Sequence, residues 1–184
     1  PQVISALDHF ASKDAMDIEG FSEKTAEQLY NEINLRSVVD LMRLNPEDLY
    51  GLEGFGAKKI GNLIQSISKS KNVTADRFLY ALGAPGIGKK TAKDLIKKFR
   101  SLENLMSATE DELSSVDGVG DILARNLVDF FGDETNKTMI ADLLDSGVNL
   151  EESEEKEGVF KGLKFVLTGS LPTLKRGEAT KIIE

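Results

Sequence analysis

Five segments of the chain carry apolar residues at the three-to-four spacing that places them on one face of a helix. The first segment opens the chain, within residues 1–17, and the others follow as far as residue 131. Their apolar positions, in chain order, are Val3, Ile4, Leu7 and Phe10; Ala26, Leu29, Tyr30 and Ile33; Leu63, Ile64 and Ile67; Leu95, Ile96 and Phe99; and Leu127, Val128 and Phe131. The pattern predicts an all-α fold for residues 1–150.

The same short motif precedes each of the last four helices: a glycine, an apolar residue, and then glycine or serine. The motifs are Gly20-Phe21-Ser22, Gly54-Phe55-Gly56, Gly86-Ile87-Gly88 and Gly118-Val119-Gly120. Their first glycines lie 34, 32 and 32 residues apart, which is an internal repeat. Each repeat therefore reads as a helix, a tight glycine hairpin and a second helix. We number the hairpins 1 to 4.

The repeats alternate, which indicates two halves of two hairpins each. Hairpins 1 and 3 are both followed by Lys-Thr-Ala, beginning at Lys24 and Lys90. The segments that precede hairpins 2 and 4 align at an offset of 64, where Arg36-Ser37 corresponds to Arg100-Ser101. A period of roughly 33 also occurs in tetratricopeptide and ankyrin repeats, but this sequence lacks their signature residues.

Helix-start signals agree with this reading. Ser37 with Asp40 and Thr109 with Glu112 fit the capping box, in which each side chain accepts a hydrogen bond from the other residue's backbone. The stretch Asn45-Pro46-Glu47 offers an N-cap followed by proline at the first helical position.

The composition changes after residue 150. Residues 151–158 include five glutamates, which is typical of a solvated linker. Beyond them, residues 160–167 predict a strand, residues 168–172 a turn, and residues 175–184 the start of a helix. One strand and part of a helix cannot bury a core. Residues 159–184 are therefore expected to be the N-terminal piece of a second, α/β domain.

The glycine hairpins suit contact with phosphate. Their glycines allow positive φ in a tight turn and lack the Cβ that would hold a ligand away from the backbone. The first N–H groups of the following helix lack intrahelical partners and lie at the positive end of the helix dipole. A lysine placed there adds a charge-assisted contact. Such a hairpin binds phosphates rather than bases, and so it positions a duplex without reading its sequence.

The charge of the chain is unevenly distributed. Its formal net charge is −8, which by itself disfavours binding to a polyanion. Between Gly54 and Arg100, however, 11 Lys or Arg residues stand against two Asp, and this segment carries +9 between acidic flanks. A basic middle segment favours a polyanionic partner. On charge alone, a solvated helix face explains the count equally well.

Residue types absent from the chain exclude several kinds of site. It contains no cysteine and a single histidine, His9, which excludes a Cys/His zinc site and a Cys/His nucleophile pair within this sequence. Its apolar runs are far shorter than the roughly 18 residues of a membrane helix, and no charged-then-apolar leader opens it. We therefore expect a cytosolic protein without a membrane partner.

The four hairpins resemble helix-hairpin-helix motifs. Together with the stretches Ala15–Gly20 and Phe165–Pro172, their order resembles the C-terminal part of bacterial NAD-dependent DNA ligases over essentially the whole chain. The ending, with Arg176, Glu178 and Ala179, is similar to the start of that family's BRCT domain. The resemblance implies a tandem helix-hairpin-helix domain that binds duplex DNA around a nick, through the minor-groove backbone. It also implies an enzyme that seals nicks in replication and repair, in the bacterial cytoplasm at the nucleoid.

The resemblance further implies that the chemistry lies elsewhere in such a ligase. The family's adenylated lysine, its NAD site, its oligonucleotide-binding domain and its zinc finger lie upstream of the hairpins. We therefore expect no catalytic residue, metal site or cofactor in this chain, and no ligation by it alone. NAD, Mg and Zn would belong to the whole enzyme. The expected partners are nicked duplex DNA and the upstream ligase domains.

Carried onto the matching positions, the resemblance predicts DNA contacts in all four hairpins. Hairpins 2 and 3 rank first, because paired lysines follow them. The predicted contact residues are Gly54, Phe55, Gly56, Ala57, Lys58 and Lys59 in hairpin 2; Gly86, Ile87, Gly88, Lys89, Lys90 and Thr91 in hairpin 3; Gly118, Val119, Gly120 and Arg125 in hairpin 4; and Gly20, Ser22 and Lys24 in hairpin 1. In hairpin 4, Asp121 stands where a lysine would help. In hairpin 1, Ser22 either caps the following helix or donates its hydroxyl to a phosphate.

Two nucleotide-binding motifs come close to matching the hairpins. Gly83–Lys89 has the spacing of a P-loop, with Phe78–Leu82 as its preceding strand, but Lys90 replaces the Ser or Thr that binds magnesium. A dinucleotide fingerprint at Gly54-Phe55-Gly56 has Lys59 where its third glycine belongs. Neither motif explains the other hairpins.

Two further alternatives use the same hairpins. A helix-hairpin-helix DNA glycosylase would need a catalytic Asp in an apolar turn, whereas residues 100–117 supply only acidic helix caps. The remaining alternative is a helix-hairpin-helix scaffold of another DNA-repair protein, which acts mainly through protein–protein contacts.

Overall fold

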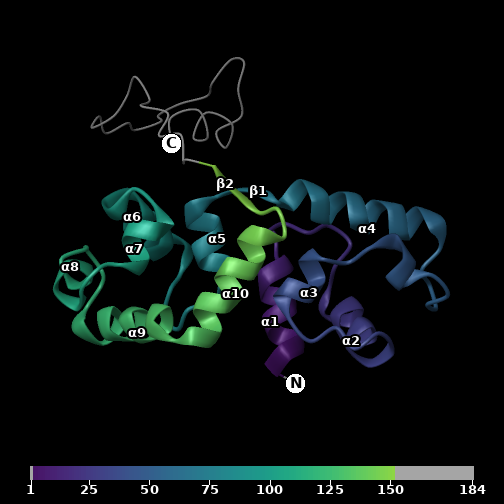
Figure 1. Cartoon of the computed structure of the whole chain (residues 1–184), viewed down its shortest axis with the longest axis horizontal. Coiled ribbons are helices and arrows are strands. Elements are labelled where there is room, and N and C mark those ends of the chain that lie inside the picture. Colours follow the sequence, from purple (N-terminus) through teal and green to yellow (C-terminus); the bar gives the residue numbers. More distant parts are fainter. Residues whose placement is uncertain (1, 152–184) are drawn as a thin grey trace, which may run out of the picture. The chain divides into compact units, whose positions relative to one another are not determined.

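The computed structural model describes residues 2–151, which belong to the first of the two units into which the chain divides, residues 1–153 and 154–184 (Figure 1). Helices make up most of this part. Its elements are α1 (Gln2–Ala11), α2 (Glu23–Glu32), α3 (Val38–Met42), the 3-10 helix η1 (Pro46–Leu49), α4 (Ala57–Ser70), β1 (Asn72–Thr74), α5 (Ala75–Ala81), α6 (Lys89–Phe99), α7 (Leu102–Met106), α8 (Glu110–Ser114), α9 (Asp121–Gly132), α10 (Glu134–Asp145) and β2 (Asn149–Glu151). The prediction of a helical domain is confirmed. Glu151, predicted as the first residue of the linker, belongs instead to β2. The rest of the predicted linker, residues 152–158, and the predicted strand and helix of residues 159–184 lie outside the described residues.

Each predicted hairpin connects two helices. Hairpin 1 lies between α1 and α2, hairpin 2 between η1 and α4, hairpin 3 between α5 and α6, and hairpin 4 between α8 and α9. The predicted tandem helix-hairpin-helix arrangement is therefore confirmed. The stretch Phe78–Leu82, which a P-loop would need as a strand, belongs to α5 and its C-cap.

The predicted apolar faces build the core. Every face contributes at least one side chain with at most 1% exposure, namely Leu7, Leu29, Leu63, Leu95 and Leu127. The two halves share this core, because Phe10 of α1 and Phe78 of α5 are both fully buried in it. His9 Nε2 lies 2.9 Å from the carbonyl oxygen of Tyr80 and adds a polar link between the same two helices. Val128 differs from the prediction, since it is 37% exposed and the buried face of α9 is narrower than its sequence suggested.

The capping box predicted at Thr109 forms in both directions. Thr109 Oγ1 accepts from the N–H of Glu112 at 3.3 Å, and Glu112 Oε2 accepts from the N–H of Thr109 at 2.8 Å. The hydrogen bonds from the backbone and the side chain of Thr109 lower the pKa of the Glu112 carboxyl below its ordinary value. The pair fixes the start of α8, the helix that leads into hairpin 4.

The other two helix starts differ in part from their predictions. Ser37 Oγ caps the N–H of Asp40 at 3.0 Å, but the Asp40 carboxylate accepts from the N–H of Arg36 at 3.1 Å, so only one arm of the predicted box forms. Asn45 and Pro46 begin a helix as predicted, yet that helix is η1, a single 3-10 turn. The N–H of Asn45 donates to Asp48 Oδ2 at 2.9 Å.

A two-stranded parallel sheet, which the sequence pattern did not predict, closes the domain. β1 pairs with β2 in the register Asn72↔Asn149, Val73↔Leu150 and Thr74↔Glu151. The N–H of Asn149 donates to the carbonyl of Lys71 at 2.7 Å, and Lys71 Nζ donates to the carbonyl of Ser146 at 2.7 Å. Figure 1 shows β1 between α4 and α5, with β2 beside it. The last strand of the domain, β2, thus pairs with β1, the strand that lies between its two halves.

A second link joins the end of the domain to its first half. Arg43 Nη2, just after α3, lies 3.9 Å from Asp142 Oδ1 and 3.9 Å from Asp145 Oδ2, both in α10. These charges lie at the surface, so the pair contributes little to stability by itself. Like the two-stranded sheet, it connects the end of the domain to its first half.

Candidate nucleic-acid interface

All four hairpins contain the same backbone turn. In each, the N–H that follows the first glycine donates to the carbonyl three residues earlier. These bonds run from Phe21 to Ile18 (3.3 Å), from Phe55 to Leu52 (3.1 Å), from Ile87 to Ala84 (3.1 Å) and from Val119 to Val116 (3.0 Å). The glycines have φ values of 82°, 74°, 82° and 80°. Positive φ at the third residue is the signature of a type II turn, and Pro85 occupies the second position, where proline is favoured.

The following helix starts directly after each turn. The N-cap residues Ser22, Gly56, Gly88 and Gly120 are all extended, and their carbonyls accept the first helical bond at 2.8 to 3.0 Å. The three glycine N-caps have no side chain to pair the first helical N–H groups, whereas Ser22 Oγ accepts from the N–H of Thr25 at 3.4 Å. Of the two roles predicted for Ser22, the structure shows the cap. Hairpins 2, 3 and 4 thus present more unpaired donors to an anion than hairpin 1 does.

The apolar residues between the glycines are buried. Phe21, Phe55, Ile87 and Val119 are each at most 8% exposed, and they belong to the hydrophobic core. Their backbone groups lie in the turn, while their side chains belong to the core. Phe55, Ile87 and Val119 were predicted as contact residues, and the structure leaves only their backbone for such a contact.

Hairpin 2 carries two lysines that have no acidic partner among the described residues. Lys58, the second residue of α4, is exposed and forms no ion pair with any residue of the described part. Lys59 follows it, and its Nζ lies 3.9 Å from the centroid of the Phe55 ring. A cation above an aromatic face keeps its charge, and the ring fixes its position beside the turn. Gly54 and Gly56 are exposed and have open space where a Cβ would be.

Hairpin 3 has a second pair of lysines, but both have acidic partners. Lys89 Nζ lies 2.9 Å from Asp14 Oδ2, and Lys90 Nζ lies 2.8 Å from Asp94 Oδ2 one helical turn along α6. The hydrogen bond and the charge of Asp94 raise the pKa of Lys90, and the charge of Asp117 adds a smaller effect. Both lysines are exposed, so these ion pairs exchange readily with solvent and with other anions. Thr91, which follows them, is half-buried.

Hairpin 4 differs from hairpins 2 and 3 in charge. Its α9 begins with Asp121 and then Ile122, at the positions that Ala57 and Lys58 occupy in hairpin 2. Its predicted cation, Arg125, is paired through Nη2 with Glu110 Oε1 at 3.2 Å. Gly118 and Gly120 still form the turn and the N-cap. Hairpin 4 therefore has the backbone of a phosphate site without its accessible charge.

Hairpin 1 contacts hairpin 2 through several atoms. The N–H of Glu19 donates to Ser66 Oγ of α4 at 2.7 Å, and Gln28 Nε2 of α2 donates to the carbonyl of Glu53 at 2.9 Å. Gly20, Gly56, Lys58 and Lys59 line one surface pocket together with Asn62 and Leu63. The exposed Lys24, second in α2, carries the only positive charge in the hairpin 1 segment of residues 18–26.

Hairpins 3 and 4 form the equivalent pair in the second half. A Cβ added to Gly86 would lie 2.9 Å from Leu123 Cδ1 of α9, so the two hairpins are in close contact. Leu123 occupies the position that Lys59 has in the first half, where the pocket opens beside Gly20. The predicted division into two halves of two hairpins each is confirmed.

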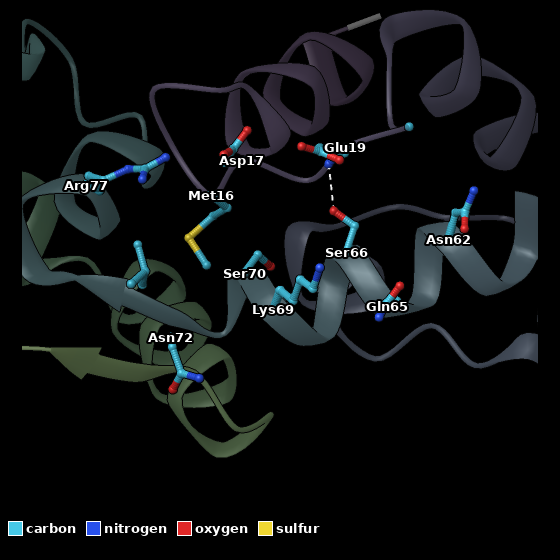
Figure 2. A pocket seen from close by; sticks show the side chains of 12 residues that line it. Met16, Asp17, Glu19, Asn62, Gln65, Ser66, Lys69, Ser70, Asn72 and Arg77 are labelled. Atoms are coloured by element: carbon cyan, nitrogen blue, oxygen red, sulfur yellow. Dashed lines mark hydrogen bonds between the residues drawn. The ribbon is translucent and has the colours of Figure 1, made fainter.

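A second pocket, of about 540 Å³, lies between hairpin 1 and α4. Figure 2 shows side chains of Asp17, Ser66, Lys69 and Arg77 around it, with the hydrogen bond between Glu19 and Ser66. Its charges are mixed, and Arg77 donates to the carbonyls of Ala15 at 3.1 Å and Lys13 at 2.6 Å. The pocket therefore concentrates no positive charge for a phosphate, and its Arg77 stabilises the loop that leads into hairpin 1.

The acidic partners of the hairpin cations were missed in the sequence. Lys90 and Asp94 are four residues apart on one helix, a spacing that predicts an ion pair and could have been used. Asp14 and Glu110 lie far in sequence from Lys89 and Arg125, and no local pattern indicates these pairs. Lys71 and Arg77, which were counted in the basic segment, donate to backbone carbonyls and serve the fold.

Within residues 2–151, no group of three or more His, Cys, Asp or Glu side chains is placed to hold a metal ion. Among the same residues, no helix combines the length and the apolar character required to cross a bilayer.

Comparison with known families supports the description of the two halves. Residues 13–69 match the sequence model of the SAM-like helix-hairpin-helix tandem, and residues 77–140 match that of the helix-hairpin-helix motif. Each match covers one pair of hairpins, and β1 lies between them. The chain therefore belongs to the helix-hairpin-helix proteins.

Curated relatives narrow this class. The chain is 49% identical over 180 residues to a DNA ligase of Clostridium novyi, 47% over 186 residues to one of Clostridium perfringens, and 45% over 186 residues to one of Alkaliphilus oremlandii. These matches cover 97 to 100% of the chain but only 27 to 28% of each relative. The predicted resemblance to bacterial DNA ligases is confirmed, for a region of about a quarter of their length.

Proposed function

We propose that this chain binds duplex DNA through its phosphate backbone, without reading the base sequence, as the DNA-binding region of an NAD-dependent DNA ligase. The duplex carries the nick that such a ligase seals in replication and repair, in the bacterial cytoplasm. The observation that carries the proposal is the fourfold turn. It places exposed glycine backbone and unpaired helical N–H groups side by side, with lysines directly after them in hairpins 2 and 3.

The contact residues follow from exposure and charge. In hairpin 2, the backbone of Gly54 through Ala57 binds one phosphate, and Lys58 and Lys59 neutralise it. In hairpin 3, the backbone of Gly86 through Gly88 does the same with Lys89, Lys90 and Thr91. Gly118, Gly120 and Arg125 in hairpin 4, and Gly20, Ser22 and Lys24 in hairpin 1, make weaker contacts, because fewer free donors or cations stand beside them.

The chemistry of ligation belongs to the rest of the enzyme. We assign no catalytic residue and no NAD, magnesium or zinc site to residues 1–184. Incubating the chain with radiolabelled NAD should therefore give no adenylated protein. Labelled protein would contradict the assignment of the adenylation chemistry to another part of the ligase.

The salt dependence of binding tests the main proposal. A nicked duplex with a fluorescent end, titrated with the chain between 50 and 200 mM salt, should give a log–log slope of roughly −4 to −7, at about 0.9 per phosphate. Scrambled duplexes should bind equally well, because phosphates carry no sequence information. Binding that is indifferent to salt would contradict backbone contact. An intact duplex in the same series tests the preference for a nick.

A charge-reversed variant tests whether the hairpin lysines make the phosphate contacts, and a substitution outside the hairpins is its control. Replacing Lys58, Lys59, Lys89 and Lys90 by Glu should weaken binding to every duplex and reduce the slope by roughly 3 to 4, since each lost phosphate contact removes about 0.9. Lys137→Glu, on α10 outside the hairpins, reverses one charge and should bind as the unsubstituted chain does. Unchanged affinity in the fourfold variant would favour a scaffold that uses the hairpins for protein contacts.

A further inference from the structure

Ile122 is the most exposed large apolar side chain of the described residues. It is 81% exposed, whereas the apolar residues of α9 that face the core, such as Leu127 and Phe131, are at most 4% exposed. It is the second residue of α9, immediately after the hairpin 4 turn. No neighbouring element of the described part covers it.

The position of Ile122 is the one at which the other hairpins carry lysine. The second helical residue is Lys24 in α2, Lys58 in α4 and Lys90 in α6. The turn hydrogen bond, the positive φ of the first glycine and the extended N-cap are the same in all four hairpins. The side chain of Ile122 therefore starts from the same point of the same backbone as those lysines do.

The charges around Ile122 disfavour a phosphate. Asp121 directly precedes it, Asp117 lies earlier in the hairpin turn, and Arg125 is paired with Glu110 at 3.2 Å. A phosphate near Ile122 would meet the Asp121 carboxylate, and Arg125, the cation of hairpin 4, is already paired. The part of a duplex that suits this surface is the uncharged one, the deoxyribose rings between the phosphates.

Ile122 also lies beside the cationic hairpin of its own half. The neighbouring residue, Leu123, reaches to within 2.9 Å of the position of a Cβ on Gly86. A duplex bound by Lys89 and Lys90 would therefore lie next to the start of α9. Covering an exposed isoleucine on binding is favourable, because it removes apolar surface from water.

We propose that Ile122 packs against the deoxyribose of the bound duplex, so that hairpin 4 contributes an apolar contact where hairpins 2 and 3 contribute charge. This inference rests on the proposed binding of duplex DNA. Apolar side chains of proteins that bind the minor groove contact uncharged parts of DNA, frequently by insertion between base steps. The contact releases no counterions, and this property separates it from the lysine contacts.

The experiment measures the affinity of Ile122 variants and of a control variant for the same nicked duplex, and the dependence of that affinity on salt. Ile122→Ala should weaken binding by about threefold to tenfold, as expected for partial loss of a buried aliphatic side chain, with an unchanged log–log slope. Ile122→Leu keeps the apolar surface and should bind within about twofold of the unsubstituted chain. Val128→Ala, at a partly exposed apolar residue of the same helix, is the matched control and should leave affinity unchanged.

The outcomes separate this inference from the one on which it rests. If the unsubstituted chain binds and Lys58→Glu weakens it, but Ile122→Ala binds normally, the deoxyribose contact is wrong and the backbone site stands. A slope that changes with Ile122→Ala would also overturn the contact, since it would indicate a rearranged phosphate site. If the unsubstituted chain binds no duplex, both proposals fail. Circular dichroism of each variant verifies the fold.

Discussion

Hairpin 2 and hairpin 4 are the second hairpins of their halves, and their residues correspond at an offset of 64. Their backbones agree in the turn bond, the glycine φ and the extended N-cap. Their side chains disagree, because Lys58 and Lys59 correspond to Ile122 and Leu123. In a single hairpin, the contributions of the backbone and of the side chains could not be told apart. The two hairpins together indicate that the glycines make the turn, and that the residues after the turn determine what it can bind.

The surroundings of the two hairpins differ in the same direction. Arg125 and Glu110 form an ion pair beside hairpin 4, and their counterparts in the first half are Gly61 and Pro46. Gly61 and Pro46 line an open surface groove instead. Hairpin 2 therefore keeps its lysines without acidic partners among the described residues, whereas the cation of hairpin 4 is paired.

The largest expected difference concerns charge. Lys58→Glu with Lys59→Glu should weaken binding to a nicked duplex by about a hundredfold at 0.1 M salt, because two counterion-releasing contacts are lost and reversed. Arg125→Glu in hairpin 4 should change the affinity by less than about threefold, since an exposed, already paired charge contributes little. Fluorescence anisotropy measures both. Equal losses would show that the charge difference between the hairpins does not govern binding.

The next effect concerns the turns themselves. Gly118→Ala should lower the free energy of unfolding by roughly 1 to 2 kcal/mol, because an L side chain at positive φ is strained. Gly54→Ala should cost the same, as both positions have open space for a Cβ. Gly86→Ala should cost somewhat more, because its Cβ would meet Leu123 at 2.9 Å. Urea denaturation gives the values, and a neutral Gly118→Ala would contradict the shared geometry.

A smaller effect is expected at the caps that precede the two hairpins. Thr109 and Asn45 correspond at the same offset of 64, and each N–H donates to a carboxylate three residues on. Thr109→Ala should cost about 1 kcal/mol of unfolding free energy at neutral pH. Asn45→Ala should cost less, because η1 is a single turn.

The cap of α8 should also depend on pH. The lowered pKa of Glu112 in the folded chain means that its contribution to stability is present above its unfolded pKa and is lost as the pH falls through its folded pKa. The difference between the unsubstituted chain and Thr109→Ala should therefore shrink below about pH 4.5. A difference that grows on acidification would contradict the capping box.

The smallest effect is expected from a substitution that makes hairpin 4 more like hairpin 2. Glu110→Gln should release Arg125 and raise the affinity for duplex DNA by up to about fivefold, the range of an exposed ion pair. The salt slope should steepen by at most about 0.9 if Arg125 then reaches a phosphate. Glu134→Gln, which releases Lys137 outside the hairpins, is the control for a simple change in net charge. No gain beyond this control would show that Arg125 does not face DNA.

The sequence predicted the repeated parts of this fold well. Four copies of one turn, with glycines where positive φ is required and apolar faces after them, leave little choice of local structure. The pairing of hairpins into halves was also predictable, because Lys24 matches Lys90 and Arg36 matches Arg100. A single glycine hairpin would not have given this result.

Parts that depend on distant contacts were not predictable. The strands β1 and β2 have three residues each, too few to show an alternating pattern, and they pair across most of the domain. The charge count treated Lys71 and Arg77 as available, whereas both donate to backbone carbonyls. The ion pairs of Lys89 and Arg125 join segments that are adjacent only after folding.

The pairing of β2 with β1 has a consequence for synthesis of the chain. When a ribosome has completed β1 and the first two hairpins, the strand that pairs with β1 and hydrogen-bonds to Lys71 is still untranslated. Domains generally fold as units as they emerge, and here the unit is complete only with Asn149–Glu151. A nascent chain arrested after residue 75 should therefore lack the closing contacts of its own first half. Although the repeat divides the sequence in two, the last strand joins both halves in one compact unit.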